Sequence, residues 1–169
     1  MHPSLLSAKR HLEDVEIAFR RLEDIEAEVI QHLPDTKSAT EAKTILRASQ
    51  IEDIYTGMER TLKELLKAVD KLIYGAGPSW HKNLLLQAAS RNDLNERGPI
   101  MPEALFQHLD NLRAFRNAVR SNYGFGLRHD DVNRNEDILI EAVAMFRAEV
   151  NDFLTTYEPP SDGTRLPGI

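Results

Sequence analysis

Three arginines on one predicted helix are the residues of this chain best suited to contact a phosphate. Arg113, Arg116 and Arg120 occupy positions i, i+3 and i+7, so their side chains project from one broad helix face. A guanidinium group presents a fork of N–H donors that matches the oxygens of a phosphate. The chemistry that this spacing favours is phosphate recognition.

Arg116 stands where the helix pattern requires an apolar side chain. Between residues 105 and 126 the apolar face of the helix is formed by Leu105, Leu109, Leu112, Val119 and Tyr123. Arg116 fills the gap in this series, where a guanidinium is costly unless it is paired or the face opens into a polar cleft. Two interpretations follow: Arg116 forms a structural ion pair with Glu59 or Glu64, or it faces a functional cleft.

The elements that must position this face are all predicted to be helices. Helical periodicity covers residues 4–33, 40–73, 80–90 and 133–157, and strand-like alternation is found nowhere. A further helix begins near residue 102 and is ended by Gly124 and Gly126. The two long N-terminal helices should pack antiparallel because a short connection joins them. We predict an all-α antiparallel bundle of four or five helices, as one domain over residues 1–158. Residues 159–169 should be a disordered tail.

Local signals give the expected boundaries of these helices. Ser4 is the expected N-cap of the first helix, Ser38 or Thr40 of the second, and Ser79 of the third. Gly57 lies inside the second helix, where it costs roughly 1 kcal/mol relative to alanine. It either permits close approach of another backbone or is a tolerated defect.

Composition restricts the classes of function. The chain has 169 residues, of which 41% are hydrophobic, and this suffices for one domain with a core. A formal net charge of −6 disfavours broad, nonspecific binding to nucleic acids or membranes, but it allows a local basic cleft. The absence of cysteine excludes disulfides and thiolate chemistry. We expect a cytoplasmic protein without membrane spans.

Sites for metals or cofactors find little support. The histidines are scattered, and the closest approach to a ligand set is His129 followed by two aspartates, which also suits a solvated loop with an aspartate capping the next helix. The glycine-rich residues 74–78 follow a helix and lack the lysine of a phosphate loop. We therefore expect no metal and no cofactor.

Residues 116–123, RNAVRSNY, resemble the signature of the HEPN superfamily and, within it, of HepT-like toxins. In that signature an arginine precedes a polar residue, then a histidine four to six positions after the arginine, then a tyrosine two beyond it. The alignment places Asn117 at the polar position, Ser121 where the histidine belongs, and Tyr123 at the tyrosine. Further resemblance lies in residues 55–63, 80–85 and 97–100 and in the YGFGL sequence that follows the motif helix.

This resemblance implies a homodimer in which two copies of the motif face each other across a cleft. Active members are metal-independent RNA endonucleases, in which the arginine stabilises the scissile phosphate and the histidine transfers a proton during attack by the ribose 2′-hydroxyl. Arg113 and Arg120 would add contacts to RNA or phosphate. HepT-like proteins are usually encoded beside a nucleotidyltransferase antitoxin that can adenylylate the motif tyrosine, here Tyr123.

Ser121 departs from this pattern, because a hydroxyl cannot act as an acid or base near neutral pH as histidine can. Arg116, Asn117 and Ser121 therefore hold the catalytic positions, but the proton-transfer group is missing unless another residue, such as His108 or His129, replaces it. Three hypotheses remain. The chain is a HepT-like toxin component that acts on RNA, an inactive HEPN dimer that binds RNA, a nucleotide or a protein through its arginine cleft, or a plain dimerisation domain.

Overall fold

A computed structural model describes residues 2–71, 79–121 and 126–157, and five α-helices make up most of these residues. They are α1 (Pro3–Glu28), α2 (Lys37–Val69), α3 (Trp80–Ala89), α4 (Glu103–Ser121) and α5 (His129–Tyr157), with short 3-10 helices at Ile30–His32 and Asp93–Asn95. The predicted all-α bundle with two long N-terminal helices is confirmed. The predicted helix break at residues 74–78, Gly124 and the tail 159–169 lie outside the described residues.

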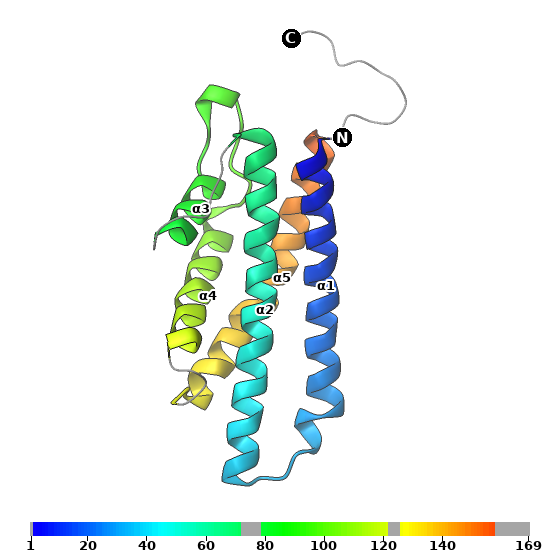
Figure 1. The fold of residues 1–169 in the computed structure, drawn as a ribbon, viewed down its shortest axis with the longest axis vertical. Helices are drawn as coiled ribbons and strands as arrows, with labels where there is room; N and C mark the ends of the chain where they lie inside the picture. Colours follow the sequence, from blue (N-terminus) through cyan, green and yellow to red (C-terminus); the bar gives the residue numbers. More distant parts are fainter. Residues whose placement is uncertain (1, 72–78, 122–125, 158–169) are drawn as a thin grey trace.

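Helix α2 is the central element of the bundle. It packs against α1, α3, α4 and α5, and Figure 1 shows α1 on one side of it, α3 and α4 on the other, and α5 crossing behind. Its buried apolar residues cover a face broad enough for these neighbours: Ile51, Ile54, Tyr55, Met58, Leu62, Leu65 and Leu66. Residues on this face of α2 can therefore meet side chains from several other helices. None of the described helices is long and apolar enough to cross a membrane.

Gly57 allows α1 and α2 to approach each other closely. A Cβ atom built on Gly57 would lie 2.7 Å from Cγ2 of Val15, well inside van der Waals contact. The branched side chain of valine has little freedom to move away. Of the two interpretations offered by the sequence, the structure supports close approach, although the approaching group is a side chain of α1.

The N-caps of the first two helices differ from those expected. His2 caps α1 in place of Ser4, because its Nδ1 accepts a hydrogen bond from the Ser4 backbone N–H while proline occupies the first turn. Thr36 caps α2 in place of Ser38 or Thr40, and its hydroxyl accepts a bond from a backbone N–H of the first turn. Each helix therefore begins slightly earlier than predicted.

Two other boundaries also differ from the prediction. Helix α1 ends at Glu28, and a 3-10 turn carries the chain to Leu33, which is extended as a residue before proline prefers. Helix α5 begins at His129 rather than near residue 133, so Asp130 and Asp131 lie within its first turn instead of capping it. Acidic side chains are favourable there because the helix N-terminus carries partial positive charge.

A buried arginine holds the connection between α3 and α4 against the end of α2. Arg97 is 1% exposed, and its Nε and Nη2 donate to the two carboxylate oxygens of Asp70 at 3.0 and 2.7 Å. Its remaining donors bond to the backbone carbonyls of Gln87, Ser90 and Gly98. Burial raises the pKa of Asp70, but hydrogen bonds from Arg97 and other donors outweigh burial and lower it to about 2. This clamp fixes where α4 begins.

Candidate functional site

Arg116 lies on the buried face of α4, as its place in the apolar series predicted. Leu105, Leu109 and Leu112 are fully buried on this face, and Arg116 is only 7% exposed among them. Phe115, which the apolar series did not include, is buried as well. The arginine is thus enclosed by its own bundle rather than standing on an open helix surface.

The Nε of Arg116 has no hydrogen-bond partner within the described residues. It is the single buried side-chain nitrogen or oxygen atom of that part of the chain in this condition. The ion pair with Glu59 or Glu64, one of the two interpretations of the sequence, is not found within the described residues; Glu59 is bonded to Tyr55 and His81, and Glu64 lies 3.7 Å from Lys67. An unpaired buried donor costs about 1–3 kcal/mol. Groups of this kind need an explanation, which a ligand can provide.

Arg113 and Arg120 flank Arg116, and each has a carboxylate partner. Nε of Arg113 donates to Oδ1 of Asp110 at 2.7 Å, one turn earlier on α4. Nε of Arg120 donates to Oε1 of Glu52 on α2 at 2.5 Å, and the Arg120 side chain is 61% exposed. An exposed ion pair of this type contributes at most about 1 kcal/mol. A phosphate could therefore replace Glu52 as the partner of Arg120 at small cost.

Asn117 and Ser121 are not brought onto the same face as Arg116. Successive residues of an α-helix are rotated by about 100°, and both side chains are exposed at the end of α4. Tyr123, the possible adenylylation target, lies outside the described residues. The motif therefore divides into an inward arginine and outward polar groups.

One exposed stripe of α4 contains four small side chains, Ala104, Ala114, Ala118 and Ser121. Ala104, Gln107, Asn111, Ala114, Ala118 and Ser121 are all exposed and follow one another at alternating spacings of three and four residues. This is the periodicity of a seam that packs against another helix. Small residues in such a seam let two helix backbones come close together.

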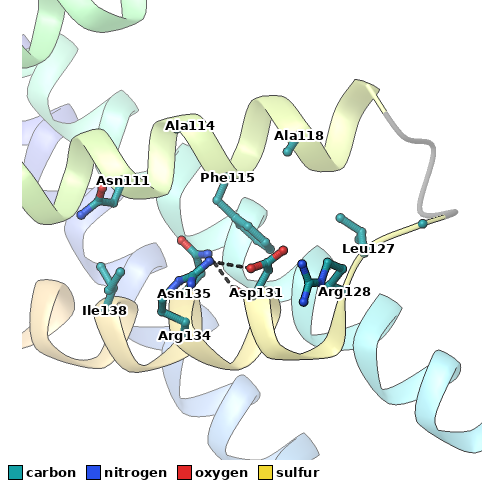
Figure 2. A pocket seen from close by; sticks show the side chains of 11 residues that line it. Asn111, Ala114, Phe115, Ala118, Leu127, Arg128, Asp131, Arg134, Asn135 and Ile138 are labelled. Atoms are coloured by element: carbon teal, nitrogen blue, oxygen red, sulfur yellow. Dashed lines mark hydrogen bonds and ion pairs between the residues drawn. The ribbon is translucent and has the colours of Figure 1, made fainter.

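A pocket of about 450 Å³ lies between α4 and the start of α5. Figure 2 shows Phe115 directed from α4 towards α5, with Arg128 near Leu127 at one end of the pocket and Asn135 beside Asp131 on α5. Nη2 of Arg134 donates to Oδ1 of Asp131, and Nδ2 of Asn135 donates to the Asp131 carbonyl. Ala118 of the RNAVRSNY motif lines this pocket, whereas Arg116, Asn117, Arg120 and Ser121 do not.

A largely buried chain of polar side chains is formed by Tyr55 and Glu59 of α2 and His81 of α3. The sequence did not indicate that these residues interact. The hydroxyl of Tyr55 donates to Oε1 of Glu59 at 2.8 Å, and Nδ1 of His81 lies 2.6 Å from the same oxygen. Burial, followed by the charge of Glu59, raises the pKa of Tyr55, while the guanidiniums of Arg113 and Arg116 act to lower it. Tyr55 therefore stays protonated and acts as a hydrogen-bond donor.

The family model described as HepT-like protein matches residues 46–157, from the middle of α2 to the end of α5. The chain belongs to the HepT-like family of the HEPN superfamily. The match covers α4 with its arginines and also the Tyr55, Glu59 and His81 cluster. No curated protein and no solved structure was found to match the chain.

The two histidines considered as substitutes for Ser121 in this HepT-like chain are engaged elsewhere. Nε2 of His108 lies 3.3 Å from Oε2 of Glu141 on α5, and Nδ1 of His129 lies 3.1 Å from the hydroxyl of Thr44. His81, which was not considered, is the histidine joined to the cluster near the arginines. Its one sequence signal was indirect: Glu59 is a carboxylate on the apolar face of α2 and requires a partner.

No group of three histidine, aspartate or glutamate side chains placed to hold a metal ion is found within the described ranges of this HepT-like protein.

Proposed function

We propose that this protein is the toxin component of a HepT-like toxin–antitoxin pair and acts on RNA. The observation that carries the proposal is the motif arginine, Arg116, whose buried Nε lacks an acceptor within the described residues. A phosphodiester oxygen is an acceptor with the charge and geometry that a guanidinium favours. Family membership supports a HepT-like domain, and the arginine supports the type of ligand.

Arg120 is the second phosphate contact in this proposal. It is exposed beside the end of α4, and its present partner Glu52 belongs to a weak surface pair. RNA bound there would exchange Glu52 for a phosphate, and the binding should weaken as salt rises, because counterion release drives such contacts. The acidic chain then needs only this local positive field, rather than a cationic surface.

We also propose that the protein forms a homodimer through the exposed face of α4. The seam of small residues on α4 supports packing of this helix against its copy across a two-fold axis. Asn117 and Ser121, which are exposed in one protomer, would then face the second copy of the motif.

RNA binding by variants tests the proposal. A labelled single-stranded RNA of mixed sequence is titrated with the wild type, with Arg116→Ala, and with Arg10→Ala, which removes an exposed arginine of α1. Loss of a charge-assisted hydrogen bond, worth about 1.5–3 kcal/mol, predicts an affinity at least tenfold lower for Arg116→Ala. Arg10→Ala should stay within about twofold of the wild type. Equal affinity for Arg116→Ala and the wild type would reject the site.

A second candidate function is RNA binding without cleavage. Ser121 favours it, because the exposed hydroxyl at the histidine position cannot act as a general acid or base near neutral pH. Cleavage that appears only after Ser121→His would establish a nuclease that has lost its catalytic base. Cleavage by the wild type would instead require a proton acceptor from another part of the chain.

The proposed antitoxin is a nucleotidyltransferase that adenylylates Tyr123. A nucleotidyltransferase reading frame beside the gene would support this pairing. Incubation of the two proteins with ATP should then add one adenylyl group to the wild type and none to Tyr123→Phe, as measured by intact-protein mass spectrometry. Equal labelling of both forms would exclude Tyr123 as the target.

A further inference from the structure

We infer that His81 is the proton acceptor of this site, held in place by Glu59, and that it supplies from α3 the imidazole absent from the motif helix. This inference rests on the proposed action on RNA and deepens it from binding to cleavage. It names a residue outside the motif as the general base. Glu59 has the role of a positioning residue.

The His81 ring is fixed from two directions. Its Nδ1 lies 2.6 Å from Oε1 of Glu59, and its ring stacks on Trp80 with centroids 3.7 Å apart. A carboxylate oxygen can only accept, so the proton of the neutral ring resides on Nδ1 and Nε2 keeps its lone pair. The His81 side chain is 19% exposed, so it reaches the protein surface while Glu59 stays buried. This arrangement fixes the ring and leaves part of the side chain accessible to a ligand.

His81 belongs to the same three-helix junction as Arg116. Helices α2, α3 and α4 all pack against one another, as Figure 1 shows. Tyr55 of α2 donates to the carboxylate that holds His81, and Arg116 lies on the buried face of α4, which packs against both α2 and α3. Nζ of Lys63 lies 5.5 Å from the Trp80 ring centroid and adds a cation beside the histidine. A phosphodiester at this junction would meet both a guanidinium and an imidazole.

A purely structural histidine would not need this arrangement. His108 provides the comparison, since its carboxylate partner Glu141 is 69% exposed and forms an ordinary surface pair. Glu59 is instead buried with two donors on one oxygen. Apolar side chains of similar volume often stabilise such an interior as well or better. The polar trio is therefore better explained by chemistry than by packing.

The proposed step balances without any added reactant. Nε2 of His81 takes the proton of a ribose 2′-hydroxyl, the 2′-oxygen bonds to the adjacent phosphorus, and the bond from phosphorus to the 5′-oxygen breaks. The leaving 5′-oxygen takes a proton from solvent, and His81 later returns its own proton to solvent. The products are a 2′,3′-cyclic phosphate and a 5′-hydroxyl. Glu59 stabilises the imidazolium, and Arg116 stabilises the charge on the phosphate oxygens.

The test measures cleavage and binding separately on the full-length chain. The substrate is a single-stranded RNA of mixed sequence, with the all-deoxy oligonucleotide as the chemical control that cannot react. His81→Asn retains a donor near the position of Nδ1 but lacks Nε2, and His108→Asn is the matched control. We expect kcat to fall by about 10²- to 10⁴-fold for His81→Asn, with KM changed less than twofold. His108→Asn should keep wild-type kcat.

Two further variants separate chemistry from folding. Added imidazole should restore part of the cleavage by His81→Ala and none by Arg116→Ala. Glu59→Gln should lower kcat with KM unchanged, because the ring loses its orienting carboxylate. Circular dichroism shows which variants are folded, and His81→Asn decides the question if His81→Ala does not fold.

The outcomes distinguish this inference from the proposed function. Wild-type kcat in folded His81→Asn would overturn the role of His81. A wild type that binds RNA through Arg116 without cleaving it would also overturn the inference, while the RNA-directed function would stand. RNA binding that does not depend on Arg116 would overturn the proposed function itself.

Discussion

Replacing Arg116 with methionine should stabilise the folded protein while it removes RNA binding. Methionine keeps a long flexible stem that fills the space of the arginine stem without carrying a charge. The substitution removes a buried nitrogen that has no acceptor within the described residues. A residue kept for its ligand at the expense of stability should behave in this way.

The magnitude follows from the cost of an unpaired buried donor, about 1–3 kcal/mol. Arg116→Met should therefore raise the free energy of unfolding by about 1–3 kcal/mol. For a domain of this size each kcal/mol moves Tm by about 2–4 °C. A shift of this size is readily measured by thermal or urea unfolding followed by circular dichroism.

Arg97 gives a matched control with the opposite sign. It is also buried, but it makes bonds to Asp70 and to backbone carbonyls. Arg97→Met would leave the carboxylate of Asp70 buried without its partner, which costs about 3–5 kcal/mol. Both variants are compared with the wild type at one protein concentration and without RNA, because association and ligands stabilise the folded state.

A loss of stability would refute this reasoning. If Arg116→Met lowers the free energy of unfolding by more than about 1 kcal/mol, Arg116 has a favourable structural partner in the folded protein. The interpretation of Arg116 as a structural residue of a plain dimerisation domain would then be preferred. If the Arg116→Met variant is stabilised and still binds RNA normally, Arg116 is neither a structural residue nor the phosphate contact.

Three other perturbations test the fold and the interface. The pKa of Asp70 is lowered from 3.8 to about 2 in the folded state. Its contribution to the free energy of unfolding is therefore complete above about pH 3.8 and is lost as the pH falls through 2. Urea unfolding across this pH range should show a loss of about 2 kcal/mol. Gly57→Ala should be destabilising by about 1–2 kcal/mol in thermal unfolding, because the clash with Val15 exceeds the gain in helix propensity. Ala118→Arg should convert the proposed dimer to a monomer in analytical ultracentrifugation, because a long charged side chain cannot fit a close helix seam.

Each of these predictions has a control. Asp70→Asn should remove the acid-dependent part of the stability, and an unchanged pH profile would contradict the assignment. Val15→Ala should relieve the effect of Gly57→Ala, and strictly additive effects would show that the two residues do not clash. Glu13→Arg adds an arginine on an exposed part of α1 and should leave the dimer intact. A monomeric wild type at micromolar concentration would contradict the proposed interface.

The helices and the unusual position of Arg116 could be predicted because they depend on local periodicity. A repeat of apolar residues identifies one face of a helix without reference to any neighbour. Helix ends were less predictable because several nearby hydroxyl groups compete for one cap: Thr36 caps α2 although Ser38 and Thr40 are equally suitable residue types.

The partners of the buried polar residues could not be read from local patterns. Asp70 and Arg97 are 27 positions apart in sequence, and Glu59 and His81 are 22 apart, so each contact depends on how a later segment packs against α2. Arg116 shows this limit of sequence patterns. The periodicity of its helix placed it on the buried face, but it could not decide whether Glu59 or Glu64 was its partner.

The sequence by itself determined the fold class, the family resemblance, and the fact that an arginine occupies an apolar position. Only the tertiary structure decided that Glu59 bonds to Tyr55 and His81, that Arg116 keeps an unpaired Nε within the described residues, and that Asn117 and Ser121 point outward. The physical reason is that helical periodicity arises from bonds within four residues. Hydrogen bonds between helices depend instead on how the helices are rotated and packed, which is a property of the whole core.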